Sequence, residues 1–337
     1  MPTTLTIPPF PKLPEPTDAV PFPVLSFSMI DEFLRCERRF FFKYLLRYDL
    51  GLRQTALEFG DSWHKGVRVW YDTRDVGKAK EAFSIAWGGD PKAVGLDGKR
   101  TDFGHGGDSQ DDDLRTEAMA HKRLEEYAQR YDREPFKVLA QEVRLAIPIG
   151  SFWYQVVIDR IIEWEDGILY VKESKSTTRL GAMFFKRFDP DYQTRGYVVA
   201  AAELLDPRIS NAYIDAMWLG KTRPKEGDMF ARDFVSVPEW KKREFENAVL
   251  TLGSDINKKA RAWREIYADM QTDHTPQEIA AWAVEPDPQI FVPDFSACTD
   301  FGECPYRGLC ITEPAARLGR LRTDYKKREE RKREVEA

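Results

Sequence analysis

The sequence contains few cysteines and histidines and no long hydrophobic run. Of its 337 residues, four are cysteine and four are histidine. No apolar stretch approaches the length needed to cross a bilayer, and the N-terminus lacks the charged start and apolar core of a secretory signal. We therefore expect a soluble, cytoplasmic protein. In such a reducing compartment, one distant cysteine and three clustered ones favour ligation of a metal or cluster over a disulfide scaffold.

The chain also lacks an excess of basic residues. It carries 51 Lys and Arg against 56 Asp and Glu, a formal net charge of -5. This balance argues against a protein that coats nucleic acid with a uniformly basic surface. It is compatible with an enzyme whose acidic site is neutralised by a metal and whose substrate contacts are local. A hydrophobic content of 42% is enough for a sizeable core, in one large domain or two smaller ones.

Residues 156–175 predict a β-hairpin that carries charged side chains. Two runs rich in β-branched and aromatic residues flank Asp166-Gly167, a dipeptide that readily adopts the positive φ angles of a tight turn. Folding the runs about this turn brings Asp159 opposite Glu173, and strand alternation places Glu173 and Lys175 on one face. Buried charges are costly unless they are paired or bind a metal. We therefore predict a divalent-metal site suited to phosphodiester cleavage.

Further elements follow from periodicity and from glycine and proline positions. Helices are predicted over residues 28–45, 55–71, 114–131, 190–205 and 238–270, strands over 137–148, 212–219 and 230–237, an extended proline-rich segment over 1–24, a long loop over 88–113, and a solvated helical tail over 317–337. The alternation of strands and helices predicts an α/β fold.

Local signals predict how several of these helices begin. Ser28 followed by Asp31 indicates an approximate capping box for the helix predicted over 28–45. Asp111–Asp113 are expected to cap the helix predicted over 114–131. Asp189-Pro190 provides an N-cap and a proline at the first helical position. Gly60 lies inside a helix, where it costs about 1 kcal/mol relative to alanine, so we expect a packing or close-approach constraint there.

A basic stripe is predicted along the first helix. Arg35, Arg39, Lys43 and Arg47 recur at i, i+4 spacing. Two interpretations stay open: a solvated charged face, or a surface on which Arg35, Arg39 and Lys43 contact DNA phosphates.

Several short motifs follow one another in order over residues 25–311. They are Leu25-Ser26-Phe27-Ser28, Cys36, His64 after Phe59-Gly60, Glu142, Ile158-Asp159-Arg160, Glu173-Ser174-Lys175, Gln193 and Tyr197 in a Q-x-x-x-Y pattern, and a segment with three cysteines. This order resembles the RecB-like branch of the PD-(D/E)xK nuclease superfamily. The resemblance implies a restriction-endonuclease-like α/β fold, with a mixed central sheet flanked by helices.

The resemblance also implies roles for individual residues. Asp159 and Glu173 would ligate Mg²⁺ or Mn²⁺ together with the backbone carbonyl of Ser174. His64 would be a further ligand or would orient one, and Lys175 would be the catalytic lysine.

Three other positions carry weaker assignments. Gln193 and Tyr197 would hold substrate phosphate or orient the site, and Glu142 is a candidate carboxylate for a second metal or for a contact to a metal ligand.

The sequence departs from the family pattern at Ile158, which replaces the proline of the motif name, and at Val156, where glycine is common. Neither departure removes a ligand.

The four cysteines point to a particular group within this branch. Iron–sulfur nucleases, including AddB-type nuclease domains and the CRISPR-adaptation exonucleases, use one cysteine near the first helix and three near the C-terminus to bind a [4Fe-4S] cluster. By resemblance, Cys36 would join Cys298, Cys304 and Cys310 in such a cluster and clasp the two ends of the domain together. The C-x5-C-x5-C spacing departs from the commoner C-x2-C-x5-C. A structural Zn²⁺ site and unrelated buried thiols therefore stay open.

These features together predict a Mg²⁺- or Mn²⁺-dependent DNA exonuclease. It would act on single-stranded or end-frayed DNA in recombination, repair, phage DNA processing or CRISPR adaptation. The alternative is a non-catalytic DNA-binding or scaffold module. A structural zinc protein without a DNA role would explain the cysteines but not the acidic and Q-x-x-x-Y motifs. The chain has no helicase motif, so the expected partners besides DNA are a helicase, a recombinase or a CRISPR-adaptation integrase.

The predicted domain organisation has three parts. Residues 1–24 form the proline-rich segment, 25–311 the nuclease domain with its cluster, and 312–337 a charged helical tail.

Overall fold

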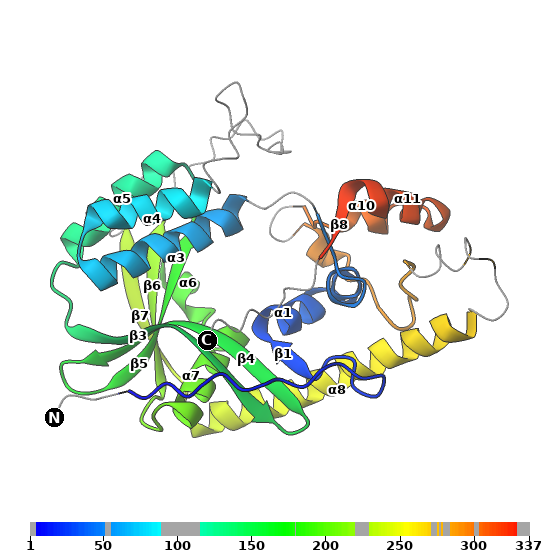
Figure 1. Ribbon diagram of the computed structural model, residues 1–337, viewed down its shortest axis with the longest axis horizontal. Helices are drawn as coiled ribbons and strands as arrows, with labels where there is room; N and C mark the ends of the chain where they lie inside the picture. Colours follow the sequence, from blue (N-terminus) through cyan, green and yellow to red (C-terminus); the bar gives the residue numbers. More distant parts are fainter. Residues whose placement is uncertain are drawn as a thin grey trace. The chain divides into compact units, whose positions relative to one another are not determined.

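The computed structural model describes most of the chain (Figure 1). The described residues are 5–50, 55–88, 115–178, 180–219, 229–270, 275, 278, 284–299 and 303–328. They belong to two compact units: unit 1 comprises Met1–Pro11, Leu52–Ile147 and Gln155–Phe245, and unit 2 comprises Lys12–Gly51, Pro148–Tyr154 and Glu246–Ala337. Within the described part of the chain, no helix is both long and apolar enough to cross a membrane.

Unit 1 is built on a mixed β-sheet. Its strands are β3 (Phe136–Ile149), β4 (Phe152–Trp164), β5 (Leu169–Thr177), β6 (Asn211–Trp218) and β7 (Phe230–Ser236), although the last residues of β3 and the first of β4 belong to unit 2. The order is β4-β5-β6-β7, with β3 also paired to β4. β5 pairs with β4 and β6 pairs with β7 antiparallel, whereas β5 and β6 are parallel. The predicted hairpin is therefore β4–β5, and a helical crossover joins β5 to β6.

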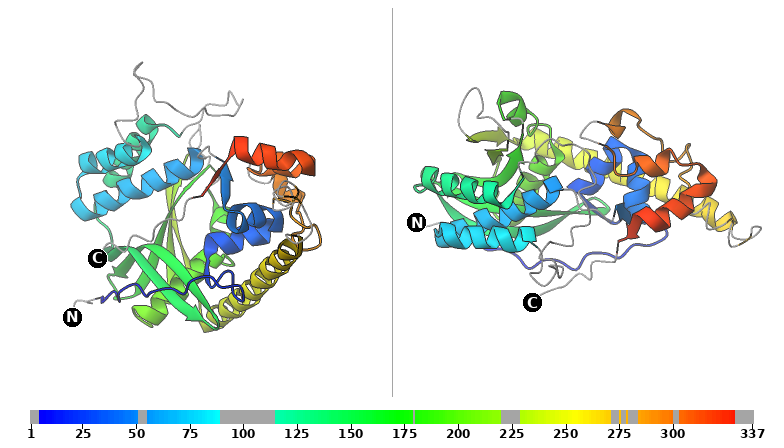
Figure 2. Two further views of the ribbon diagram at one scale, coloured as in Figure 1. Left: turned by 45° about the vertical axis from the view of Figure 1, so that its right-hand side comes forward. Right: turned by 90° about the horizontal axis from the view of Figure 1, so that it is seen from above.

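Helices cover both faces of this sheet. α3 (Thr55–Thr73), α4 (Val76–Gly88) and α5 (Glu117–Arg130) lie over one face (Figure 2), and the crossover contains α6 (Ala182–Lys186) and α7 (Tyr192–Leu204). Trp63, Trp70 and Tyr127 from the helices pack with Ile162 and Tyr213 from the strands in one buried cluster. This cluster holds α3 and α5 on the sheet.

The close-packed glycine of α3 is Gly66 and not Gly60. A Cβ atom at Gly66 would stand 3.1 Å from the carbonyl oxygen of Ala79 and 3.2 Å from a methyl carbon of Leu124. A Cβ at Gly60 would meet nothing within 4 Å. The packing constraint expected at Gly60 is therefore absent among the described residues.

Two helices of unit 1 use other caps than those predicted. α5 is capped by Thr116, and Asp111–Asp113 lie outside the described residues. α7 is capped by Asp191, whose carboxylate accepts from the Thr194 N–H at 3.2 Å, so the assignment of this role to Asp189 was wrong. A capping side chain must reach the free N–H groups of the first turn, and the residue next to that turn does so.

Unit 2 contains the N-terminal and C-terminal helices. Its elements are β1 (Val24–Ser26), α1 (Phe27–Arg35), α2 (Glu37–Phe40), the π-helical turn Phe41–Leu45, β2 (Tyr48–Leu50), the 3-10 turn Ser296–Cys298, α10 (Arg307–Cys310), α11 (Pro314–Asp324) and β8 (Tyr325–Lys327), with α8 (Glu239–Met270) entering from unit 1. α8 passes close to β1 and β4, since a Cβ at Gly253 would stand 2.7 Å from Leu25 and 2.8 Å from Phe152.

The predicted first helix is interrupted. Cys36 is extended, with φ -168°, and separates α1 from α2. The capping box predicted from Ser28 and Asp31 is absent, because the N-cap residue is Ser26 and no side-chain cap bond forms. Asp31 instead pairs with Arg35 at 2.9 Å.

The C-terminal tail packs where a solvated helix was predicted. Leu321 in α11 is fully buried, and the buried guanidinium of Arg317 donates to the Leu309 carbonyl at 3.0 Å. β8 pairs antiparallel with β2. The predicted helix is therefore confirmed up to Asp324, but the prediction of a fully solvated tail was wrong at Arg317 and Leu321, and residues 325–327 form a strand.

Candidate active site

The candidate site lies where β4 and β5 separate. Their antiparallel ladder reaches the pair Arg160–Lys172, and the next residues on the two strands are Asp159 and Glu173. There the Ser174 N–H donates to Asp159 Oδ2 at 2.8 Å. A side chain thus takes the place of a backbone acceptor, and this arrangement ties the Asp159 carboxylate to β5.

His64 reaches the same carboxylate oxygen from α3. Its Nδ1 atom lies 3.0 Å from Asp159 Oδ2. Burial alone would lower the pKa of His64, but the charge and hydrogen bond of Asp159 outweigh it and raise that pKa. Burial alone would raise the pKa of Asp159, but His64 outweighs it and holds that pKa well below its usual range. Each partner therefore favours the charged form of the other.

A chain of hydrogen bonds links Glu173 to α7. Lys175 Nζ donates to Glu173 Oε1 at 2.5 Å and to Gln193 Oε1 at 2.8 Å. Gln193 Nε2 donates to the Tyr197 hydroxyl at 2.8 Å. Because Tyr197 occupies the amide nitrogen, the amide oxygen of Gln193 faces the ammonium group. Gln193 therefore contacts Lys175 directly, and Tyr197 acts on Lys175 through Gln193.

One carboxylate oxygen of the site has no hydrogen-bond partner. Glu173 Oε2 is buried and unpaired, and burial and then the nearby charge of Asp159 raise the pKa of Glu173 to about 6. An orphaned buried carboxylate oxygen beside a second carboxylate matches the hard oxygen ligands that Mg²⁺ and Mn²⁺ prefer. Among the described residues no three His, Cys, Asp or Glu side chains converge on a single metal position. Asp159 contacts His64, and Glu173 contacts Lys175. The donor set fits such a metal.

Glu142 lies apart from these contacts. It adopts a φ of 51°, the left-handed region that L-residues rarely occupy, so β3 is kinked here. None of the described hydrogen bonds or ion pairs joins Glu142 to the site residues, and its role stays a prediction. Its neighbour Gln141 instead accepts from Arg160 Nε at 2.9 Å. The sequence analysis assigned no role to Gln141 or Arg160. The only feature of the sequence that could have indicated one is the position of Arg160 next to Asp159.

The basic residues of the first helix have carboxylate partners within unit 2. Arg39 and Lys43 pair with the buried Glu32 at 2.7 and 2.6 Å, and Arg35 pairs with Asp31 at 2.9 Å. Contact of these three cations with DNA phosphate stays a prediction.

All four cysteines belong to unit 2 and are free thiols. Cys36 and Cys304 are buried, and the Asp294 N–H donates to Cys36 Sγ at 3.4 Å. Burial raises the pKa of Cys310 to about 11; Arg38 opposes this rise, while Cys36 and Cys304 add to it. The charge of Cys36 thus reaches Cys310, although the two are far apart in sequence, but among the described residues no three of these thiols lie close enough together to hold a metal ion.

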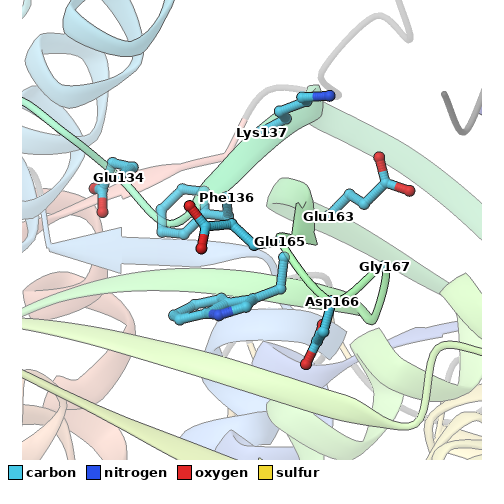
Figure 3. A pocket seen from close by; sticks show the side chains of 8 residues that line it. Glu134, Phe136, Lys137, Glu163, Glu165, Asp166 and Gly167 are labelled. Carbon is cyan, nitrogen blue, oxygen red and sulfur yellow. The ribbon is translucent and has the colours of Figure 1, made fainter.

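A cavity of about 590 Å³ lies at the turn of the β4–β5 hairpin (Figure 3). It is lined by Glu134, Phe136, Lys137, Glu163, Trp164, Glu165, Asp166 and Gly167. This cavity is at the far end of the hairpin from Asp159. Four carboxylates against one lysine would repel a polyanion, so the cavity does not extend the candidate site.

A mixed sheet flanked by helices, with an aspartate, a glutamate and a lysine on adjoining strands, is consistent with a restriction-endonuclease-like nuclease. Comparison with protein families gives a match to the PD-(D/E)XK nuclease superfamily over residues 24–311. The chain belongs to the PD-(D/E)XK nuclease superfamily. A search of curated proteins finds no match.

Proposed function

We propose that the protein is a Mg²⁺- or Mn²⁺-dependent DNA exonuclease of the RecB-like type. It hydrolyses phosphodiester bonds in single-stranded or end-frayed DNA. The observation that carries this proposal is the unpaired, buried Oε2 of Glu173 beside Asp159, with Lys175 oriented by Gln193. Apolar packing does not account for such a group, because each of these charges is costly to bury.

The chain's own groups divide the work of hydrolysis. Asp159, Glu173 and the Ser174 carbonyl would hold the metal, which supplies charge neutralisation on the phosphate and an activated water. Lys175 orients the attacking water through its ammonium group, at a position set by Gln193. His64 holds Asp159 or joins it as a ligand.

The four thiols of unit 2 bind a [4Fe-4S] cluster in this proposal, with structural Zn²⁺ as the alternative. Four free cysteines from two distant segments of one unit support it, since four thiolates satisfy either group. The nuclease would work in the cytoplasm in recombination, repair, phage DNA processing or CRISPR adaptation. A helicase, a recombinase or a CRISPR-adaptation integrase would then present the DNA.

Digestion of end-labelled DNA tests the activity. Single- and double-stranded DNA labelled at either end is incubated with Mg²⁺, with Mn²⁺ and with a chelator. We expect metal-dependent shortening from an end, and a loss of roughly 10²–10⁴-fold in rate for Glu173→Ala and Lys175→Ala. Glu165→Ala, at the exposed hairpin turn, is the matched control and retains full rate. Unchanged cleavage by either site variant would overturn the assignment.

A scaffold role is the second candidate. It requires DNA binding without cleavage, and inactivity of the wild-type protein on every substrate would favour it. The presence of Asp159, Glu173 and Lys175 together supports the catalytic role, because a module that only binds DNA has no need of all three.

A further inference from the structure

Arg160 is a buried cation directly behind the candidate site. It is 1% exposed and follows Asp159 in β4, so its side chain points to the opposite face of that strand. Its Nε donates to Gln141 Oε1 and its Nη1 donates to Ser174 Oγ, both at 2.9 Å. The guanidinium also lies over the ring of Tyr71, 4.8 Å from its centroid. One side chain on β4 thus contacts β3, β5 and α3.

None of the described hydrogen bonds or ion pairs joins this guanidinium to a carboxylate, although its charge helps to lower the pKa of Asp159. Both of its hydrogen-bond acceptors are neutral oxygens. Burying a cation without a direct ion pair is costly, and an apolar side chain of similar size would avoid that cost. Arg160 therefore has a role that apolar packing could not fill.

Ser174 connects Arg160 to the metal carboxylates. Its hydroxyl accepts from Arg160 on one face of β5, while its N–H donates to Asp159 Oδ2 in the gap between the strands. It is also the residue between Glu173 and Lys175. A bond that fixes Ser174 therefore limits how far the two strands can move apart at the site.

Gln141 is itself held in place by α3. Its amide nitrogen donates to Asp72 and to the Arg68 carbonyl, the latter at 3.5 Å, so its oxygen is turned toward Arg160. Arg68 and Asp72 follow His64 at i+4 and i+8, on the same side of the helix. Arg160 is thus bonded through Gln141 to the helix that carries His64.

We propose that Arg160 is a positioning residue of the nuclease site, which clamps β3, β4 and β5 together through Gln141 and Ser174. The clamp fixes the strand that carries Asp159 against the strand that carries Glu173, and it would thereby keep both carboxylates in place for one metal ion. This inference rests on the proposed function, because it assigns Arg160 to the same metal site.

Binding of Mn²⁺ to the full chain tests the clamp without requiring cleavage. The free Mn²⁺ signal in electron paramagnetic resonance gives the Kd for wild type, Ser174→Ala and Arg160→Lys, at a temperature well below each unfolding midpoint. Ser174→Ala removes one hydroxyl, and Arg160→Lys keeps the charge but cannot bridge both acceptors. The matched control is Ser176→Ala, two residues further along β5.

We expect a roughly 10-fold weaker Kd for Ser174→Ala and about 10- to 100-fold for Arg160→Lys, as for other groups that orient metal ligands. The metal concentration for half-maximal cleavage should rise by the same factor, and Ser176→Ala should match wild type. An unchanged Kd in folded Ser174→Ala would overturn the clamp, and so would an unchanged Kd in folded Arg160→Lys. A lower unfolding midpoint of either variant with an unchanged Kd would show a structural role only and would likewise overturn it. If Arg160→Lys fails to fold, Ser174→Ala decides alone. Failure of the wild-type protein both to bind Mn²⁺ and to cleave DNA would instead overturn the proposed function, and the clamp with it.

Discussion

At the scale of single residues, Glu173 lies in an environment that disfavours its charge. Burial and the neighbouring Asp159 raise its pKa from 4.5 to about 6. Because the folded-state pKa is the higher one, the stabilisation from protonated Glu173 is complete below pH 4.5 and is lost as the pH rises through about 6. A carboxylate held in this way is primed to accept a cation in place of a proton.

The substitution Glu173→Gln should therefore stabilise the protein while it abolishes cleavage. In chelator at pH about 8 we expect a free energy of unfolding higher by about 2 kcal/mol, because wild-type Glu173, with its pKa raised to about 6, has by then lost the proton that the fold favours. The gain should shrink as the pH falls toward about 5. Urea unfolding at several pH values measures it, with the exposed Glu165→Gln as control. A less stable Glu173→Gln at pH about 8 would contradict this account.

Tyr197 should affect the rate of cleavage and not metal binding. Tyr197→Phe removes the acceptor of the Gln193 amide nitrogen, so the amide can rotate away from Lys175. We expect cleavage at saturating metal to fall about 10-fold, since small misplacements of a catalytic group are expensive. The Kd for Mn²⁺ should be unchanged because both carboxylates keep their contacts. A raised Kd with an unchanged rate would show that the Q-x-x-x-Y pair acts on the metal ligands instead.

At the scale of elements, a buried polar cluster joins the sheet to α3 and α5. The Tyr127 hydroxyl donates to Asp215, which also pairs with Lys172 and Arg232. Tyr127 accepts from Arg232 at 3.1 Å and lies 3.0 Å from the Tyr71 hydroxyl. Burial lowers the pKa of Lys172 to about 8, although Asp215 opposes that effect. The cluster thus connects β5, β6 and β7 with α5 and with α3, the helix that carries His64.

Tyr127→Phe should weaken that connection. It leaves buried charged groups with one partner fewer, at a cost of about 1–3 kcal/mol in the free energy of unfolding. Tyr131→Phe, one turn further along and only partly buried, should cost no more than about 0.5 kcal/mol. Urea denaturation of both variants provides the comparison, and equal losses would exclude a special role for the Tyr127 hydroxyl.

The helix boundaries show which elements the sequence could predict. The long α8 and the strands β6 and β7 were predicted within one or two residues, because their apolar periodicity extends over several turns or pairs. α4 was missed because its described buried apolar residues are only Ala79 and Phe83, a narrow stripe. The break at Cys36 was also missed, since nothing in the local residue types opposes a continuous helix there.

At the scale of the whole molecule, the open question for unit 2 is which metal group its four cysteines bind, a [4Fe-4S] cluster as proposed or Zn²⁺. Anaerobically purified protein should be brown, with broad absorbance near roughly 400 nm and iron bound to the chain. Cys304→Ser should lose iron and absorbance and lower the unfolding midpoint, because metal binding contributes to folding. A colourless wild-type protein with stoichiometric zinc would replace the cluster by a structural zinc site.

The β4–β5 hairpin, the order of the acidic, lysine and Q-x-x-x-Y motifs, and hence the superfamily could all be predicted from the amino-acid sequence. Such features depend on neighbouring residues, through strand alternation, turn chemistry and helical spacing. Only the tertiary structure decided that β8 pairs with β2, that Leu321 is buried, and that Arg160 bonds to Gln141 and Ser174. The β2–β8 pairing joins segments far apart along the chain, and the other two features depend on how side chains pack between elements, which no local pattern encodes.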